Sequence, residues 1–242
     1  MKTTSHGENL IQLTRLPRAF PVNAYLVRED DGFTLVDAAL PGSAPAILAA
    51  ARALGAPIAR IALTHAHGDH VGALDDLHAA LPAAEVAITA RDARFLVGDM
   101  SLDPDEPQTR PRGQYVRRAT RPTRTLQPGD RVGSLQVVAA PGHTPGHVAF
   151  LDTRDGTLIV GDAFQTRGGI AVSGTLRPLF PFPALATWHK PTALESARAL
   201  RAHNPRRLAV GHGAVLDAPL AAMDRAIAAA ERRLEVGTRR AA

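Results

Sequence analysis

The stretch that decides the fold reads Thr64-His65-Ala66-His67-Gly68-Asp69-His70. It follows residues 58–63, a short apolar run rich in β-branched side chains, which predicts a buried strand. It precedes residues 71–81, where the helical spacing of apolar positions predicts a helix. The polar residues of this stretch are therefore expected at a corner where a strand turns into a helix.

The order of the polar residues in this stretch indicates metal binding. Side chains alternate along an extended segment, so His65 and His67 leave the chain on the same face and can hold one ion together. Asp69 and His70 come at the start of the predicted helix, where they are better placed to reach a second ion. Imidazole and carboxylate groups in a chain with no cysteine favour zinc or another first-row metal.

The pattern His-x-His-x-Asp-His after a strand resembles the signature of the metallo-β-lactamase superfamily. Later segments resemble further motifs of that superfamily, in the expected order. They are Ala140-Pro-Gly-His143-Thr-Pro-Gly-His147, similar to the third-histidine loop; Ile159-Val-Gly161-Asp162, similar to the bridging-aspartate strand; and Val210-Gly-His212-Gly213, similar to the last ligand segment. The resemblance runs from about residue 23 to the final predicted helix, and it points to the lactonase and glyoxalase II-like branch.

This resemblance implies a site for two divalent metal ions, with zinc as the first choice and iron or manganese as alternatives. It places His65, His67 and His143 on the first ion, Asp69, His70 and His212 on the second, and Asp162 as the bridge between them. Each of these residues follows or ends an apolar strand, so we expect all of them at the same edge of the sheets. A carboxylate that bridges two ions about 3.5–4 Å apart is what a two-metal hydrolase needs.

The chemistry expected of such a site is hydrolysis. Two divalent ions that share a water lower its pKa from about 15.7 toward 7 and so supply hydroxide at neutral pH. The hydroxide would attack an ester, lactone, amide or thioester carbonyl, and Asp69, the predicted catalytic residue, or a metal-bound water would carry the proton. We predict a dinuclear metal-dependent hydrolase that cleaves an ester or lactone. A glyoxalase II-like thioesterase and a mononuclear iron oxidoreductase similar to persulfide dioxygenases stay open.

The choice of substrate rests on features outside the metal motifs. Glyoxalase II-type enzymes usually carry a helical C-terminal extension, whereas residues 213–242 are enough for one helix. Lactonases of the superfamily often place a tyrosine three residues after the bridging aspartate, where this chain has Gln165, with Phe164 beside it. Residues 176–182 are apolar and stiffened by proline, which predicts a pocket wall for an acyl or aromatic group, or else a packed surface loop.

Two further residues are expected to support the metal ligands. Ligand imidazoles usually need a hydrogen-bond partner on their second nitrogen. His147 follows His143 by four positions and is assigned to the loop or to such a supporting bond. Asp37 ends a predicted strand at the same sheet edge and is a candidate partner for a ligand histidine.

Strands and helices alternate unevenly along the chain. The predicted strands are residues 22–27, 33–37, 58–63, 85–89, 135–140, 148–152, 158–160 and 207–210, and the predicted helices are residues 44–54 with Ser43 as cap, 71–81, 91–97, 192–203 and 218–234. This pattern predicts a mixed α/β (α+β) fold, and the resemblance narrows it to a four-layer αβ/βα sandwich. With no linker between the motifs, residues 1–242 are expected to form one domain.

Composition limits the partners and the compartment. The formal charge is +5, but the arginines that cluster in residues 110–124 have no interleaved aromatic residue beyond Tyr115 and no nucleic-acid module, so a solvated loop, an anion-binding surface or a dimer contact is expected there. No apolar run approaches the roughly 18 residues of a membrane span, and the polar start of the chain does not resemble an export signal. We expect a cytoplasmic protein with a small-molecule substrate and with no nucleic-acid or membrane partner. A homodimer and a monomer both stay open.

Overall fold

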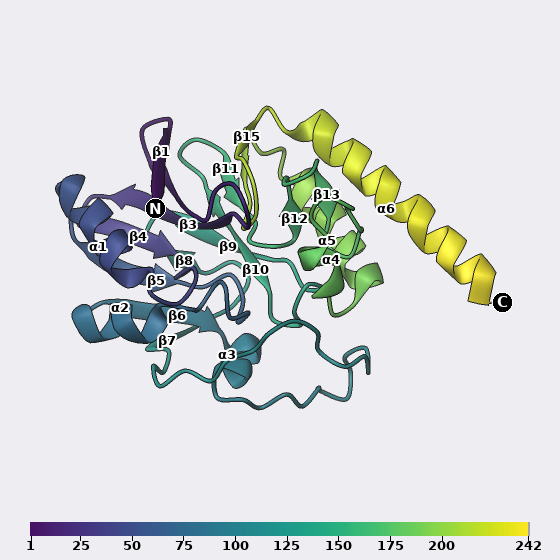
Figure 1. Ribbon diagram of the computed structural model, residues 1–242, viewed down its shortest axis with the longest axis horizontal. Helices are drawn as coiled ribbons and strands as arrows, with labels where there is room; N and C mark the ends of the chain where they lie inside the picture. The colour runs from purple at the N-terminus through teal and green to yellow at the C-terminus, as the bar shows by residue number, and fades with distance from the viewer. Residues whose placement is uncertain (242) are drawn as a thin grey trace. The chain divides into compact units, whose positions relative to one another are not determined.

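The computed structural model describes residues 1–241, and of residues 237–241 it describes the backbone alone. Contacts divide the chain into two compact units. Unit 1 comprises residues 1–100 and 114–137, and unit 2 comprises residues 101–113 and 138 onward. Figure 1 traces the elements of both along the chain. The expectation of a single domain over residues 1–242 stays a prediction.

Unit 1 is built on a seven-stranded mixed sheet. In pairing order its strands are β1 (Lys2–His6), β2 (Leu10–Arg15), β3 (Val22–Glu29), β4 (Gly32–Val36), β5 (Ile58–Ala62), β6 (Glu85–Thr89) and β7 (Arg124–Leu126). Pairing is antiparallel from β1 to β4 and parallel from β4 to β7. The unit also holds β8 (Arg131–Val132), which pairs with the start of β9 (Leu135–Ala139).

Helices α1 (Ala44–Ala53), α2 (Leu74–Ala80) and α3 (Ala90–Leu96) complete unit 1. The apolar stripes of α1 and α2, which carry Ile47 and Leu77, are fully buried in the same core as Leu35 and Ile61 of the sheet. Strand β4 is buried along its whole length because it lies in the middle of the sheet. The loop between β5 and α2 therefore starts and ends on elements that the core holds in place.

Unit 2 has a second mixed sheet, in the order β15 (Leu216–Asp217), β14 (Arg207–Ala209), β11 (Thr157–Ile159), β10 (Val148–Asp152) and then β9, which enters the unit at Val138. A small hairpin pairs β12 (Phe164–Gln165) with β13 (Ala171–Val172). The helices are α4 (Phe182–Leu185), α5 (Lys190–Ala202) and the long α6 (Leu220–Ala241) that ends the chain in Figure 1. Leu200 of α5 and Met223 of α6 are fully buried in one core with Phe164.

The predicted α/β class with two sheets and flanking helices is confirmed. The sequence analysis missed the hairpin of β1 and β2. It also began the second helix too early, because α2 starts at Leu74 and the segment before it is an irregular loop. Ser43 occupies the N-cap of α1 as expected, but its side chain makes no capping hydrogen bond. Within the described residues, each helix is too short or too polar to cross a membrane.

At Gly72 in unit 1 the backbone packs closely against a second backbone segment. Its N–H donates to the Ala39 carbonyl at 2.7 Å, and a Cβ at this position would lie 2.4 Å from the Pro41 nitrogen and 2.5 Å from the Ala39 oxygen. A side chain would therefore push the residues before α1 away from the loop that precedes α2.

We expect Gly72→Ala to lower the free energy of unfolding by about 3 kcal/mol, the upper end of the usual cost of overpacking. Gly55→Ala is the matched control. Gly55 has a φ of +80° but open space where a Cβ would lie, so only its left-handed backbone should oppose the change, at about 1–2 kcal/mol. Urea denaturation of both variants measures the difference. Equal losses would contradict the proposed close contact.

Candidate metal centre

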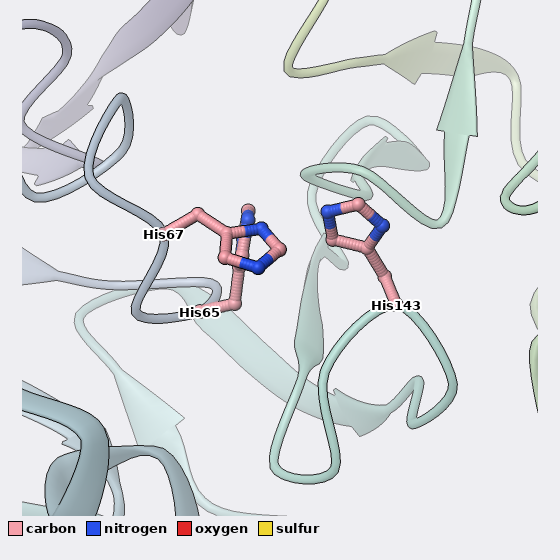
Figure 2. A group of neighbouring side chains, drawn as sticks. All are labelled: His65, His67 and His143. Carbon is pink, nitrogen blue, oxygen red and sulfur yellow. The ribbon is translucent and has the colours of Figure 1, made fainter. Parts of the chain in front are cut away.

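The loop between β5 and α2 carries four of the predicted ligands in unit 1. His65, His67 and His70 are buried and Asp69 is half-buried. The ring centroid of His65 lies 4.9 Å from that of His67 and 4.2 Å from that of His70. Figure 2 shows His65 and His67 leaving this loop. The backbone turns sharply here because the N–H of His70 donates to the His67 carbonyl at 2.9 Å.

Asp37 holds this loop from the end of β4. It adopts a φ of 63°, which is unusual for a residue other than glycine and is a form of strain found at functional sites. Its carboxylate accepts the backbone N–H of Thr64 at 2.8 Å and the Nδ1–H of His70 at 2.8 Å. The expectation that Asp37 partners a ligand histidine is confirmed. With Nδ1 engaged, Nε2 is the nitrogen of His70 that could bind a metal ion.

The hydroxyl of Thr64 orients a second imidazole. It donates its one proton to the Asp37 carboxylate, with an oxygen-to-oxygen distance of 2.8 Å. The Thr64 oxygen, 2.9 Å from Nδ1 of His65, must then accept a hydrogen bond from that nitrogen. His65 therefore also presents Nε2 as its donor atom, so one carboxylate directs two neighbouring imidazoles.

An irregular segment and a helix support the same loop. The N–H of Gly68 donates to the Gln114 carbonyl at 2.8 Å, and the ring of Tyr115 lies 4.7 Å from the ring of His67. Burial, and then the nearby Asp92 carboxylate, raise the pKa of Tyr115, so its phenol stays neutral. Asp92 is fully buried on α3 and accepts the N–H of Ala66 at 2.9 Å.

Three predicted ligands meet within unit 2. His143 lies in the loop between β9 and β10 (Figure 2), Asp162 follows β11, and His212 follows β14. The Nε2 atoms of His143 and His212 both lie 3.2 Å from Oδ2 of Asp162, and all three side chains are buried. Two imidazole nitrogens thus approach one carboxylate oxygen away from water, and these are the kinds of atom that bind divalent transition metals.

His147 supports this set rather than joining it. Its Nε2 accepts the backbone N–H of Asp162 at 3.2 Å, so it supports the backbone of a predicted ligand rather than the second nitrogen of a ligand imidazole. His212 is in contact with an aromatic ring, since the ring centroid of Phe180 lies 5.4 Å from that of His212. Gln165, at the position where lactonases often have tyrosine, is 3% exposed. Its neighbour Phe164 belongs to the hydrophobic core.

The sequence analysis named every residue in the candidate metal-binding groups. Among the described residues these groups comprise His65, His67, Asp69, His70, His143, Asp162 and His212. Such a set suggests a dinuclear metal centre, and the assignment of each residue to an ion stays a prediction. The analysis missed the supporting roles of Thr64, Asp92 and Tyr115. Only Thr64 had a local signal, since it directly precedes His65.

Comparisons with known proteins agree with this chemistry. Residues 17–212 match the family model described as the metallo-beta-lactamase superfamily. YobT of Bacillus subtilis, an uncharacterised protein, is 52% identical over 96% of this chain and 100% of its own length. YflN of the same organism, named a probable metallo-hydrolase, is 28% identical over 79% of this chain and 80% of its own length.

Further similarity extends to an enzyme of named activity and to a solved structure. A hydroxyacylglutathione hydrolase of Xanthomonas axonopodis pv. citri is 32% identical over 64% of this chain and 51% of its own length. The crystal structure of TTHA1623 in a di-iron-bound form superposes with a TM-score of 0.62 at 29% identity, covering 87% of this chain and 96% of that chain.

The role of Asp37 can be tested by Asp37→Asn. The amide keeps the size of the carboxylate but replaces one acceptor oxygen with a donor, although Thr64 and His70 both donate to this group. We expect metal affinity about 10- to 100-fold weaker, as for other supporting residues of metal ligands. Competition with a chromogenic chelator measures it. Asp31→Asn is the control, because Asp31 is an exposed carboxylate paired with Arg60, and it should leave the metal affinity unchanged. Equal metal affinities in the two variants would refute the role of Asp37.

Proposed function

The chain belongs to the metallo-β-lactamase superfamily and is a metal-dependent hydrolase; on this premise we propose that it cleaves the carbonyl ester or lactone of a small molecule. His65, His67 and His143 would hold the first ion, Asp69, His70 and His212 the second, and Asp162 would bridge them. Zinc suits these nitrogen and oxygen donors, and the di-iron form of the similar TTHA1623 structure supports iron as the alternative.

The residues of the chain divide the work of this reaction. Two bound divalent ions would supply an acidified water and polarise the carbonyl. Asp162 would balance their mutual repulsion with its negative charge. Asp69 is the least buried of the proposed ligands, which suits it to take up a proton and pass it to the leaving group.

The observation that carries the substrate class is an apolar surface next to His212. Phe180 is buried and packs against both His212 and Phe182, with ring centroids 5.4 Å apart in each pair. Around it Leu179 is 84% exposed, Phe182 53% and Leu185 59%. Exposed apolar side chains grouped in this way are typical of a binding surface. We propose that they receive the apolar arm of the substrate.

A glutathione thioester is the second candidate substrate. The similar hydroxyacylglutathione hydrolase supports it. A thioester carbonyl reacts with the same nucleophile as an ester carbonyl, so the proposed ligands serve either reaction. The two substrates differ in the arm that the protein must recognise, which is charged and peptide-like in glutathione and apolar in an acyl lactone.

We expect kcat/KM to be higher for lactones and aryl esters than for S-lactoylglutathione or bis-aryl phosphodiesters. It should rise with acyl length, because each buried methylene contributes about 0.8 kcal/mol. Phe182→Ala should weaken this dependence on length, whereas Val236→Ala, at an exposed apolar residue of α6, should not. Steady-state assays at one pH and one metal loading decide it. A clear preference for the glutathione thioester would replace the lactone proposal with the second candidate.

The bridging role of Asp162 has its own test. Protein prepared without chelator should contain about two metal ions per chain. One tetrahedral ion uses four ligands, and the candidate groups comprise seven residues. Asp162→Ala should lower both metal content and turnover, because two close cations then repel with less compensating charge. His203→Ala changes an exposed residue at the end of α5 and should alter neither. Elemental analysis gives the stoichiometry, and a value that stays at one after addition of zinc or manganese would exclude the dinuclear centre.

A further inference from the structure

A chain of buried hydroxyl groups leads away from His143 in unit 2. Nδ1 of His143 lies 2.9 Å from the Ser173 oxygen, and that oxygen lies 2.8 Å from the Thr187 oxygen. The Thr187 hydroxyl ends the chain by donating to the Pro183 carbonyl at 2.7 Å. His143, Ser173 and Thr187 are 1%, 4% and 2% exposed, so water has little access to these groups.

The last bond fixes the direction of the whole chain. A carbonyl oxygen can only accept, so the single hydroxyl proton of Thr187 belongs to the bond with Pro183. The Thr187 oxygen must then accept the proton of Ser173, and the Ser173 oxygen must accept a proton from Nδ1 of His143. The Thr187 oxygen also lies 3.4 Å from Nδ1, a longer contact than the one to Ser173.

We propose that Ser173 and Thr187 are positioning residues that hold His143 with Nδ1 protonated and Nε2 presented as the metal donor. The inference rests on the proposed role of His143 as a metal ligand. In a neutral imidazole only one nitrogen carries a proton, so a proton held on Nδ1 leaves the lone pair on Nε2. That Nε2 is the atom 3.2 Å from Oδ2 of Asp162.

The backbone around the hydroxyl chain is held by the same segments. The N–H of Trp188 donates to the His143 carbonyl at 3.0 Å, and the N–H of Ser173 donates to the Ala163 carbonyl at 3.0 Å. Ser173 is thus hydrogen-bonded to Ala163, which directly follows Asp162. Thr187 directly precedes Trp188, which is hydrogen-bonded to His143. The hydroxyl chain therefore has a fixed position relative to both ligands.

The hydroxyl chain also reaches the proposed apolar surface. Pro183 lies in α4, the single turn of helix that carries Phe182 and Leu185. The bond from Thr187 anchors this turn to the residues that orient His143. The orientation of a metal ligand and the placement of the substrate surface thus depend on the same hydroxyl.

Four variants test the proposal. Thr187→Val keeps the shape of the side chain and removes the acceptor of the Ser173 proton, so Ser173 becomes free to donate to Nδ1 and to move the imidazole proton to Nε2. Ser173→Ala removes the acceptor of the Nδ1 proton directly. Thr187→Ser restores a hydroxyl at the same place. Thr157→Val is the matched control, because Thr157 is 1% exposed in β11 and its hydroxyl bonds to Arg207 at the far end of that strand.

The first readout is metal affinity, measured with zinc by chelator competition, beside the thermal unfolding of each protein. We expect Thr187→Val and Ser173→Ala to bind zinc about 10- to 100-fold more weakly. Thr187→Ser should bind within a few-fold of the original protein, and Thr157→Val should lose stability without losing affinity. Unchanged affinity in Thr187→Val, or equal losses in Thr187→Val and Thr187→Ser, would overturn the proposal.

The second readout does not depend on activity or on bound metal. A ring N–H buried in such a chain exchanges slowly with water, so the Nδ1–H of His143 should give a protected proton resonance in 15N-labelled, metal-free protein. His143→Asn identifies that resonance by its loss. The resonance should persist in Thr187→Ser and Thr157→Val and disappear in Thr187→Val; its persistence in Thr187→Val would refute the hydroxyl chain. If the original protein binds no metal, the proposed function fails, whereas this resonance still tests the orientation of His143.

Discussion

The geometry of the β5–α2 loop depends on the hydrogen bonds that the carboxylate of Asp37 accepts from it. An imidazole can bind a metal only through the nitrogen that carries no proton, so a protein that uses histidine ligands must control where each proton lies. Asp37 does so for His70 directly and for His65 through Thr64. Its left-handed backbone costs of order 1–3 kcal/mol, and the hydrogen bonds it accepts from the loop offset that cost.

Unit 2 reaches the same end with different groups. The proton of His143 is directed by two hydroxyls that end on the Pro183 carbonyl, which carries no net charge. In unit 1 the corresponding chain ends on a carboxylate. A full negative charge near Nδ1 makes an imidazole a stronger donor than a neutral acceptor does. His65 and His70 should therefore be the more strongly donating imidazoles, and His143 should depend more on the exact placement of its neighbours.

The candidate ligands could be predicted because most of them lie in short local motifs, and the strands and helices because their apolar spacing is regular. The supporting residues could not. Ser173 and Thr187 lie 30 and 44 positions from His143, and only folding brings them to it. Strand β1 is largely exposed and lacks an apolar pattern, so its pairing with the buried β2 decides its conformation. The irregular loop before Leu74 follows from backbone bonds such as that of Gly72, which spacing does not reveal.

Both units also place an aromatic ring against a candidate ligand, and both rings come from irregular segments. Tyr115 lies against His67 and Phe180 against His212. Apolar cover of this kind excludes water and so strengthens each electrostatic interaction beneath it. The candidate ligands follow strands, whose positions the core fixes, whereas the covering rings lie in long connecting segments that tolerate change. A difference in these segments can therefore alter the substrate while the ligands stay the same. The choice between the two proposed substrate arms, apolar or peptide-like, would then depend on these segments rather than on the candidate ligands.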